Sequence, residues 1–101
     1  MKLKYSRHAA EDLERIEEYI ANELKSPQAA KNTILMLLRE CGRLKDFPLL
    51  GLALQERIGR DTDYRFLIVR QYVAFYNIVD DTVWVRRIFN ARRDYIKHLF
   101  I

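Results

Sequence analysis

Several structural classes are excluded by what the 101-residue chain lacks. It has one cysteine, Cys41, so no disulfide framework can form within it. Its two histidines, His8 and His98, are isolated, and with a single cysteine they make no plausible set of metal ligands. No apolar run approaches the roughly 20 residues that a membrane-spanning helix needs. The sequence therefore excludes a disulfide scaffold and a membrane span, and no metal or cofactor is expected.

What remains is a composition typical of a globular domain. A chain of this length buries about two thirds of the surface that it exposes when unfolded, so residues 1–101 are expected to form a single domain. Cys41 lies in an apolar helical pattern, where a thiol is more often a small buried hydrophobe than a nucleophile. The sequence shows no signal peptide, which predicts a protein made and kept in the cytosol.

The net charge of +4 is unevenly placed along the chain. Residues 1–56 carry nine basic and nine acidic side chains, whereas residues 57–101 carry nine basic and five acidic ones. Eight of the nine later cations are arginines: Arg57, Arg60, Arg65, Arg70, Arg86, Arg87, Arg92 and Arg93. Planar guanidinium groups suit bidentate pairing with phosphates and carboxylates. The C-terminal part is therefore predicted to meet a phosphate-bearing or strongly acidic partner.

The first half of the chain predicts a short strand and two helices. Residues 2–5 alternate basic and apolar side chains, as a strand does. Ser6 and Ser26 are each placed to cap a following helix, and Pro27 suits the first helical position. Apolar residues then recur every three or four positions, and the second helical pattern ends before Pro48. We expect two amphipathic helices that pair as an antiparallel hairpin and cover a sheet.

The second half of the chain predicts strands. Three runs rich in β-branched and aromatic residues cover 64–69, 72–79 and 82–89. Tight turns are expected at 70–71 and 80–81, where polar residues separate these runs. The stretch before them predicts a loop with a short strand at 55–58. Residues 92–100 predict a short terminal helix capped by Asn90.

Together these elements predict the α+β class. The expected order is an N-terminal strand, a two-helix antiparallel hairpin, a three-stranded antiparallel meander that completes a small sheet, and a short C-terminal helix. Two consecutive helices followed by a meander place both helices on one face of the sheet. The other face is then expected to be partly open.

Five short motifs follow one another in an order and at spacings that match a known superfamily. They are A-x-x-D-L-x-x-I-x-x-Y-I, L-x-x-x-P-x-x-G, an arginine before a strand, Y-x-x-x-Y in an aromatic strand, and a closing R-I-x-x-x-R-R-D. The residues that match are Ala9, Asp12, Leu13, Ile16, Tyr19, Ile20, Leu44, Pro48, Gly51, Arg65, Tyr72, Tyr76, Arg87, Ile88, Arg92, Arg93 and Asp94. With this ordered set the chain resembles the RelE/ParE superfamily of toxins from bacterial type II toxin–antitoxin systems.

The resemblance implies a small cytosolic toxin that a cognate antitoxin silences in a tight heteromeric complex. RelE-like members cleave mRNA on the ribosome, and ParE-like members inhibit DNA gyrase. RelE-type enzymes carry an arginine directly after the first tyrosine of the aromatic strand, where this chain has Val73. Cleavage of mRNA, inhibition of gyrase and a degenerate module that only binds its antitoxin therefore stay open. An acidic antitoxin segment that orders on binding suits an open sheet face beside concentrated arginines.

Metal-independent cleavage of RNA through its own 2'-hydroxyl needs a base, an acid and positive charge around the phosphate. The candidate catalytic residues are Arg65 and Arg93 for the positive charge and Tyr95 as proton donor, with His98 as the alternative donor. The resemblance places a catalytic arginine at the position of Arg93, whereas the position of the family's tyrosine is occupied here by Leu99. The candidate residues for binding nucleic acid or another target are Arg57, Arg60, Arg87, Arg92 and Lys97. We expect Arg65, Arg87, Arg92 and Arg93 to cluster at one end of the sheet.

Alternative roles exist for some of these arginines. Arg65 lies among apolar neighbours on a strand, where it can equally form a cross-strand ion pair with Asp63 or Asp81. Arg86 and Arg87 are consecutive, and strand alternation predicts that they point to opposite faces of the sheet. At most one of the two is then expected to join a given surface site.

Overall fold

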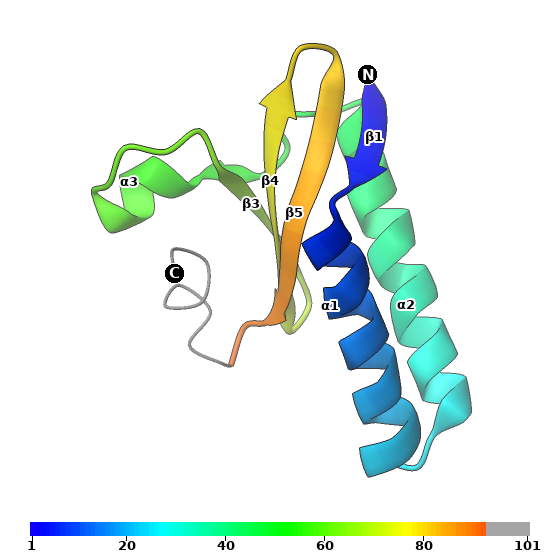
Figure 1. The fold of residues 1–101 in the computed structure, drawn as a ribbon. Helices are drawn as coiled ribbons and strands as arrows, with labels where there is room; N and C mark the ends of the chain where they lie inside the picture. Colours follow the sequence, from blue (N-terminus) through cyan, green and yellow to red (C-terminus); the bar gives the residue numbers. More distant parts are fainter. Residues whose placement is uncertain (93–101) are drawn as a thin grey trace.

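The structure is a computed structural model that describes residues 1–92 (Figure 1). Two long helices, α1 (Arg7–Glu18) and α2 (Pro27–Gly42), lie on one side of a β-sheet, and a short helix, α3 (Leu54–Ile58), lies on the other side. Apart from Arg92, the predicted terminal helix lies outside the described residues, and so do the predicted site residues Arg93, Tyr95, Lys97 and His98.

Within residues 1–92 the sheet has five strands in the order β1-β5-β4-β3-β2. Their bounds are Lys2–Tyr5 for β1, Leu52–Ala53 for β2, Arg65–Val69 for β3, Tyr72–Val79 for β4 and Thr82–Asn90 for β5. Strands β2 to β5 pair antiparallel with their neighbours, whereas β1 lies parallel to β5 at one edge. The predicted α+β class with two main helices is confirmed.

Both predicted serine caps are present. Ser6 Oγ accepts the backbone N–H of Ala9 at 3.1 Å at the start of α1. Ser26 Oγ accepts the N–H of Ala29 at 3.4 Å, and Pro27 is the first residue of α2. These bonds satisfy amides that the first turn of a helix leaves without a partner. The starts of both helices are thus encoded locally.

The segment between α2 and β3 differs from the prediction. The predicted strand at 55–58 is wrong, because these residues belong to α3 and strand pairing is limited to β2 just before it. Leu54 and Ile58 are four residues apart, so they share one side of the helix, and both pack in the cluster that contains Phe66 of the sheet. Gly59, with φ of 63°, ends the helix in the left-handed conformation that glycine adopts readily.

The main core lies between the two long helices and the facing side of the sheet. Its buried members are Ala9, Leu37, Cys41, Val69, Tyr72, Ala74, Val85 and Ile88. Cys41 has no exposed surface, which confirms the prediction of a buried thiol. Tyr72 and Ala74 belong to this cluster, whereas Val73 and Phe75 belong to a cluster on the opposite face, as the alternation of β4 predicts.

Tyr76 anchors the loop after α2 to the middle of the sheet. Its side chain is fully buried, and its Oη donates to the carbonyl of Pro48 at 2.8 Å. The same oxygen accepts the N–H of Gly51 at 3.0 Å. A Cβ at Gly51 would lie 2.5 Å from the carbonyl oxygen of Phe66, so the loop approaches the sheet too closely for any other residue. The loop is therefore held rigidly against β3 and β4.

The second face of the sheet carries a row of aromatic rings. Phe66, Phe75 and Phe89 come from β3, β4 and β5, with ring centroids 6.3 and 6.1 Å apart along the row. Leu54 of α3 packs into the same cluster. The face that was predicted to be partly open is thus covered at one side by α3.

Candidate functional site

A buried carboxylate on α1 holds Arg87 in place. Asp12 is 3% exposed and accepts hydrogen bonds from Arg87 Nε at 2.8 Å and Nη2 at 3.1 Å. It also accepts from Arg15 on the next turn of α1 and from the backbone N–H of Ile88 at 2.9 Å. Bidentate charge-assisted pairs are strong and have a fixed geometry. The fold therefore positions the Arg87 guanidinium.

This carboxylate lies at a gap in the strand pairing. β1 pairs with β5 only over residues 82–85, so among the residues that the structure describes no strand lies beside the rest of β5 on that edge. α1 runs alongside this stretch (Figure 1), where Ser6 Oγ donates to the carbonyl of Arg86 at 2.9 Å and Asp12 receives the N–H of Ile88. Polar side chains of α1 and its cap thus form hydrogen bonds with backbone groups of β5 that would otherwise lack partners at this edge of the sheet.

A groove of about 530 Å³ opens between α1 and the end of β5. Tyr19 and Phe89 supply aromatic walls, and three cations, Arg15, Arg87 and Arg92, line it as well. Tyr19 begins a π-helical turn that follows α1, and 48% of its surface is exposed. We call this cavity the Arg87 groove. It combines exposed aromatic surface with positioned positive charge.

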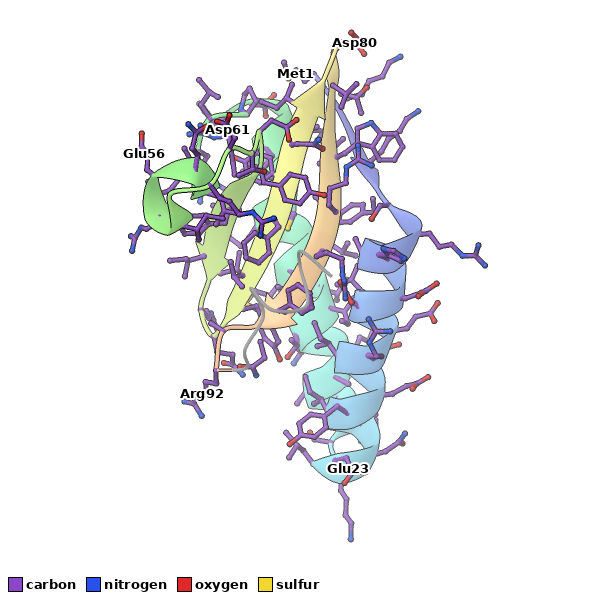
Figure 2. All side chains as sticks on the ribbon, turned by 60° about the vertical axis from the view of Figure 1, so that its left-hand side comes forward. Met1, Glu23, Glu56, Asp61, Asp80 and Arg92 are labelled. Carbon is purple, nitrogen blue, oxygen red and sulfur yellow. The ribbon has the colours of Figure 1, made fainter. Side chains whose placement is uncertain are left out.

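Arg92 follows the last residue pair of β5. Its backbone N–H donates to Asn90 Oδ1 at 2.9 Å, and the N–H of Ala91 donates to the carbonyl of Gln71 at 2.6 Å. The bond from Ala91 to Gln71 ties the end of β5 to the turn between β3 and β4. Figure 2 shows Arg92 projecting away from the sheet at this end of the molecule. The structure therefore brings two predicted binding residues, Arg87 and Arg92, to one groove.

Arg65 is engaged in a contact with the backbone of a loop. Its Nη2 donates to the carbonyl of Gly51 at 2.6 Å and to that of Leu49 at 3.3 Å. Its Nε is buried and has no hydrogen-bond partner among the described residues. The alternative of an ion pair with Asp63 or Asp81 is wrong, because the Arg65 guanidinium donates to the two loop carbonyls instead, and Asp81 pairs with Lys2.

Arg65 also lies apart from the Arg87 groove. It pairs with Tyr76 on β4, whereas Arg87 pairs with Phe75. Consecutive residues of a strand point to opposite faces, so Arg65 and Arg87 stand on opposite sides of the sheet. The predicted cluster of Arg65 with Arg87 and Arg92 is therefore wrong.

A β-bulge brings Arg86 and Arg87 to the same face. The register between β4 and β5 shifts between Phe75 and Tyr76, which leaves Arg86 as an extra residue in β5. Arg86 Nε donates to Oδ1 of Asn77 at 2.8 Å, and Asn77 stands on the same side of β4 as Phe75. The prediction that these two arginines point to opposite faces is wrong, because it assumed an unbroken strand.

Cations lie over the aromatic rings of this second face. Ring-centroid distances are 5.8 Å for Arg57 over Phe66, 4.4 Å for Arg87 over Phe89, 4.9 Å for Arg86 over Trp84 and 5.6 Å for Lys4 over Trp84. Such cation–π contacts are individually modest. Arg57 and Arg87 were predicted as binding residues, whereas the pairing of Lys4 and Arg86 with Trp84 was not foreseen. Arg60, just after α3, is exposed.

The described part of the Arg87 groove is suited to binding more than to proton transfer. Besides its arginines, its titratable residues are Asp12, Tyr19 and Tyr72. Asp12 already accepts four hydrogen bonds, and burial raises the pKa of Tyr72. Phenols are in general poor proton acceptors at neutral pH. Within residues 1–92 there is also no group of three or more His, Cys, Asp or Glu side chains that could hold a metal ion.

No helix in the described part of the chain is long and apolar enough to cross a membrane. Among solved structures, the chain resembles one titled as a chromosomal ParDE toxin–antitoxin system from P. aeruginosa. The similarity has a TM-score of 0.76 at 21% sequence identity and covers 89% of this chain and 95% of the other. A search of the curated proteins finds no match.

A family model described as the ParE toxin of the type II toxin–antitoxin system parDE matches residues 3–95. That span includes both long helices, strands β2 to β5, all of β1 except Lys2, and every described residue of the Arg87 groove. The chain belongs to the ParE toxin family of type II toxin–antitoxin systems.

Proposed function

We propose that this protein is a growth-inhibiting toxin that acts by binding DNA gyrase and does not itself catalyse bond cleavage. The observation that carries the proposal is the lining of the Arg87 groove, which consists of aromatic side chains and arginines held in place by the fold. Among the described residues, no lining side chain is a good proton acceptor. Such a lining suits recognition of a protein surface. Membership of the ParE family supports the same target.

The second candidate function is ribosome-dependent cleavage of mRNA. It rests on Arg65, Arg93 and Tyr95 as catalytic residues, with Arg57, Arg60, Arg87, Arg92 and Lys97 binding the target. The cation-bearing aromatic rings favour it, because such surfaces stack on unpaired bases. The engagement of Arg65 with loop carbonyls speaks against it, since that guanidinium is not presented to a phosphate.

The proposed resting state is a complex with an antitoxin in the cytoplasm. The excess of positive charge in residues 57–101 suits an acidic partner. A segment that becomes ordered on binding can cover several patches of a small toxin at once. The complex is therefore expected to be heteromeric, with the toxin active only when the antitoxin is lost.

Expression of the toxin alone in a bacterium tests this function. Induction is expected to stop growth and to switch on a reporter of the DNA-damage response, while total mRNA mapped by primer extension stays intact. Growth arrest with cleaved mRNA and a silent reporter would support the mRNA-cleaving alternative. Normal growth at a verified protein level would indicate a degenerate module that only binds an antitoxin.

A further inference from the structure

A second cavity of about 400 Å³ lies between α2 and the turn that joins β3 to β4. Its cations are Arg39 from the helix and Arg70 from the turn, and Leu35 and Met36 supply apolar surface. No acidic residue lines it among those that the structure describes. We call it the Arg39–Arg70 cleft. Neither Arg39 nor Arg70 was among the residues predicted to bind the target.

Both guanidinium groups of this cleft are available to a partner. Arg39 and Arg70 are exposed, and within residues 1–92 neither side chain takes part in a hydrogen bond, ion pair or ring contact. Arg87, by contrast, is held in a bidentate pair with Asp12. Two unpaired guanidinium groups facing one cavity leave a local excess of positive charge that an external carboxylate can neutralise.

The backbone at Arg70 is unusual for an arginine. Its φ is 56°, in the left-handed region where residues with a Cβ are disfavoured by about 1 kcal/mol. Glycine or asparagine would occupy this turn position at lower cost. A strained residue at a turn is a reasonable pointer to use of its side chain. The turn carries Arg70 to the mouth of a cavity.

The cleft adjoins exposed apolar surface at the end of the sheet. Leu35 is 54% exposed, and Tyr72 lines both this cleft and the Arg87 groove. Figure 1 shows α1 and α2 continuing past this end of the sheet. A segment that enters here finds apolar contacts flanked by cations on either side.

We propose that the Arg39–Arg70 cleft binds an acidic segment of the antitoxin, with two carboxylates on the guanidinium groups and an apolar side chain against Leu35 and Met36. The assignment rests on the proposed function, since it requires an antitoxin. Charge complementarity selects this occupant, because the cleft offers two unpaired cations and no acid of its own among the described residues. Apolar contacts beside paired charges give such segments both affinity and register.

Calorimetry of the full-length toxin with the protein encoded by the adjacent gene tests the assignment. The cleft variant is Arg39→Glu with Arg70→Glu, and the matched control is Arg7→Glu with Lys45→Glu, which changes net charge equally at exposed positions outside both cavities. The cleft variant is expected to bind about 100-fold more weakly than wild type, and the control within about threefold. Equal affinity of the two variants would overturn the assignment.

The remaining outcomes separate failure of the cleft from failure of the function. A wild-type toxin that binds no neighbouring gene product overturns the toxin–antitoxin proposal and the cleft with it. A cleft variant that keeps antitoxin affinity but loses binding to DNA or to gyrase assigns the cleft to the target and overturns its antitoxin role. A free toxin that dimerises only with the wild-type cleft assigns it to a second copy, with the same consequence.

Hydrogen exchange in the wild-type complex gives a readout that needs no variant. Antitoxin binding is expected to slow exchange at least about tenfold for amides of the β3–β4 turn, as burial of a solvent-exposed turn does. Unchanged exchange there, with protection elsewhere, would contradict occupancy of the cleft.

Discussion

At the scale of single residues, Asp12 has the largest structural role that the sequence did not reveal. In the sequence it is an acid early in a helix, where it also helps match a family motif. In the structure it binds Arg87 and Ile88, some 75 residues later, as well as its neighbour Arg15. Local patterning carries no information on partners so distant, so the position of Arg87 could not be predicted.

Asp12→Asn is expected to destabilise the fold by about 3 kcal/mol, because it leaves Arg87 without its buried charge partner and turns an amide N–H donor toward groups that are themselves donors. Urea unfolding followed by circular dichroism measures the change as a lower midpoint at constant slope. Glu11→Gln is the matched control. Its carboxylate pairs with Arg7 at 3.5 Å in an exposed position, so a loss below about 1 kcal/mol is expected there. Equal losses in both variants would contradict a special role for Asp12.

The Cys41 thiol gives a prediction on pH. Burial raises the pKa of Cys41 to about 11, so the folded state keeps a proton that the unfolded state releases from about pH 8.5. Stability is therefore full below pH 8.5 and falls as pH rises toward the folded value, by about 1–2 kcal/mol between pH 8.5 and 10. Unfolding curves of wild type and Cys41→Ala across this range measure the difference in slope. Parallel pH profiles would show that the thiol does not contribute.

At the scale of elements, the sequence predicts best where the determinants are local. The serine caps, Pro27 and the alternation of β4 depend on neighbouring residues, and all are found as expected. The error at 55–58 arose because Leu54 and Ile58 fit a strand or a helical turn equally well, and packing on Phe66 selects the helix. The bulge at Arg86 is set by pairing with β4, which the sequence of β5 alone does not reveal.

The loop after α2 gives a prediction at this scale. Gly51→Ala is expected to lower stability by about 1–3 kcal/mol, because the new Cβ would lie 2.5 Å from the Phe66 carbonyl oxygen and 2.8 Å from the Tyr76 ring. Gly42→Ala is the paired control, since nothing lies within 4 Å of its Cβ and it is the last residue of α2. That change is expected to add about 0.5–1 kcal/mol. Thermal unfolding in which both changes have the same sign would contradict the loop geometry.

At the scale of the whole molecule, the arginines of the C-terminal part are divided among several tasks. Arg65 holds a loop, Arg57 and Arg86 lie over aromatic rings, and Arg70 faces a cleft beside α2. The sequence correctly located the excess of charge. It did not separate structural from available guanidinium groups, because that depends on which carbonyls and carboxylates the fold brings near them. Of the predicted binding residues, Arg87 and Arg92 share a groove, whereas Arg57 and Arg60 do not line it.

The proposed inhibition of gyrase by binding can be tested with purified components. The most direct measurement is the supercoiling of relaxed plasmid by gyrase over a range of concentrations of wild-type toxin, with mRNA integrity followed in a translating extract at the same concentrations. Supercoiling is expected to be progressively lost while the mRNA stays intact. Normal supercoiling at a large excess of toxin, together with cleaved mRNA in the extract, would contradict the proposal.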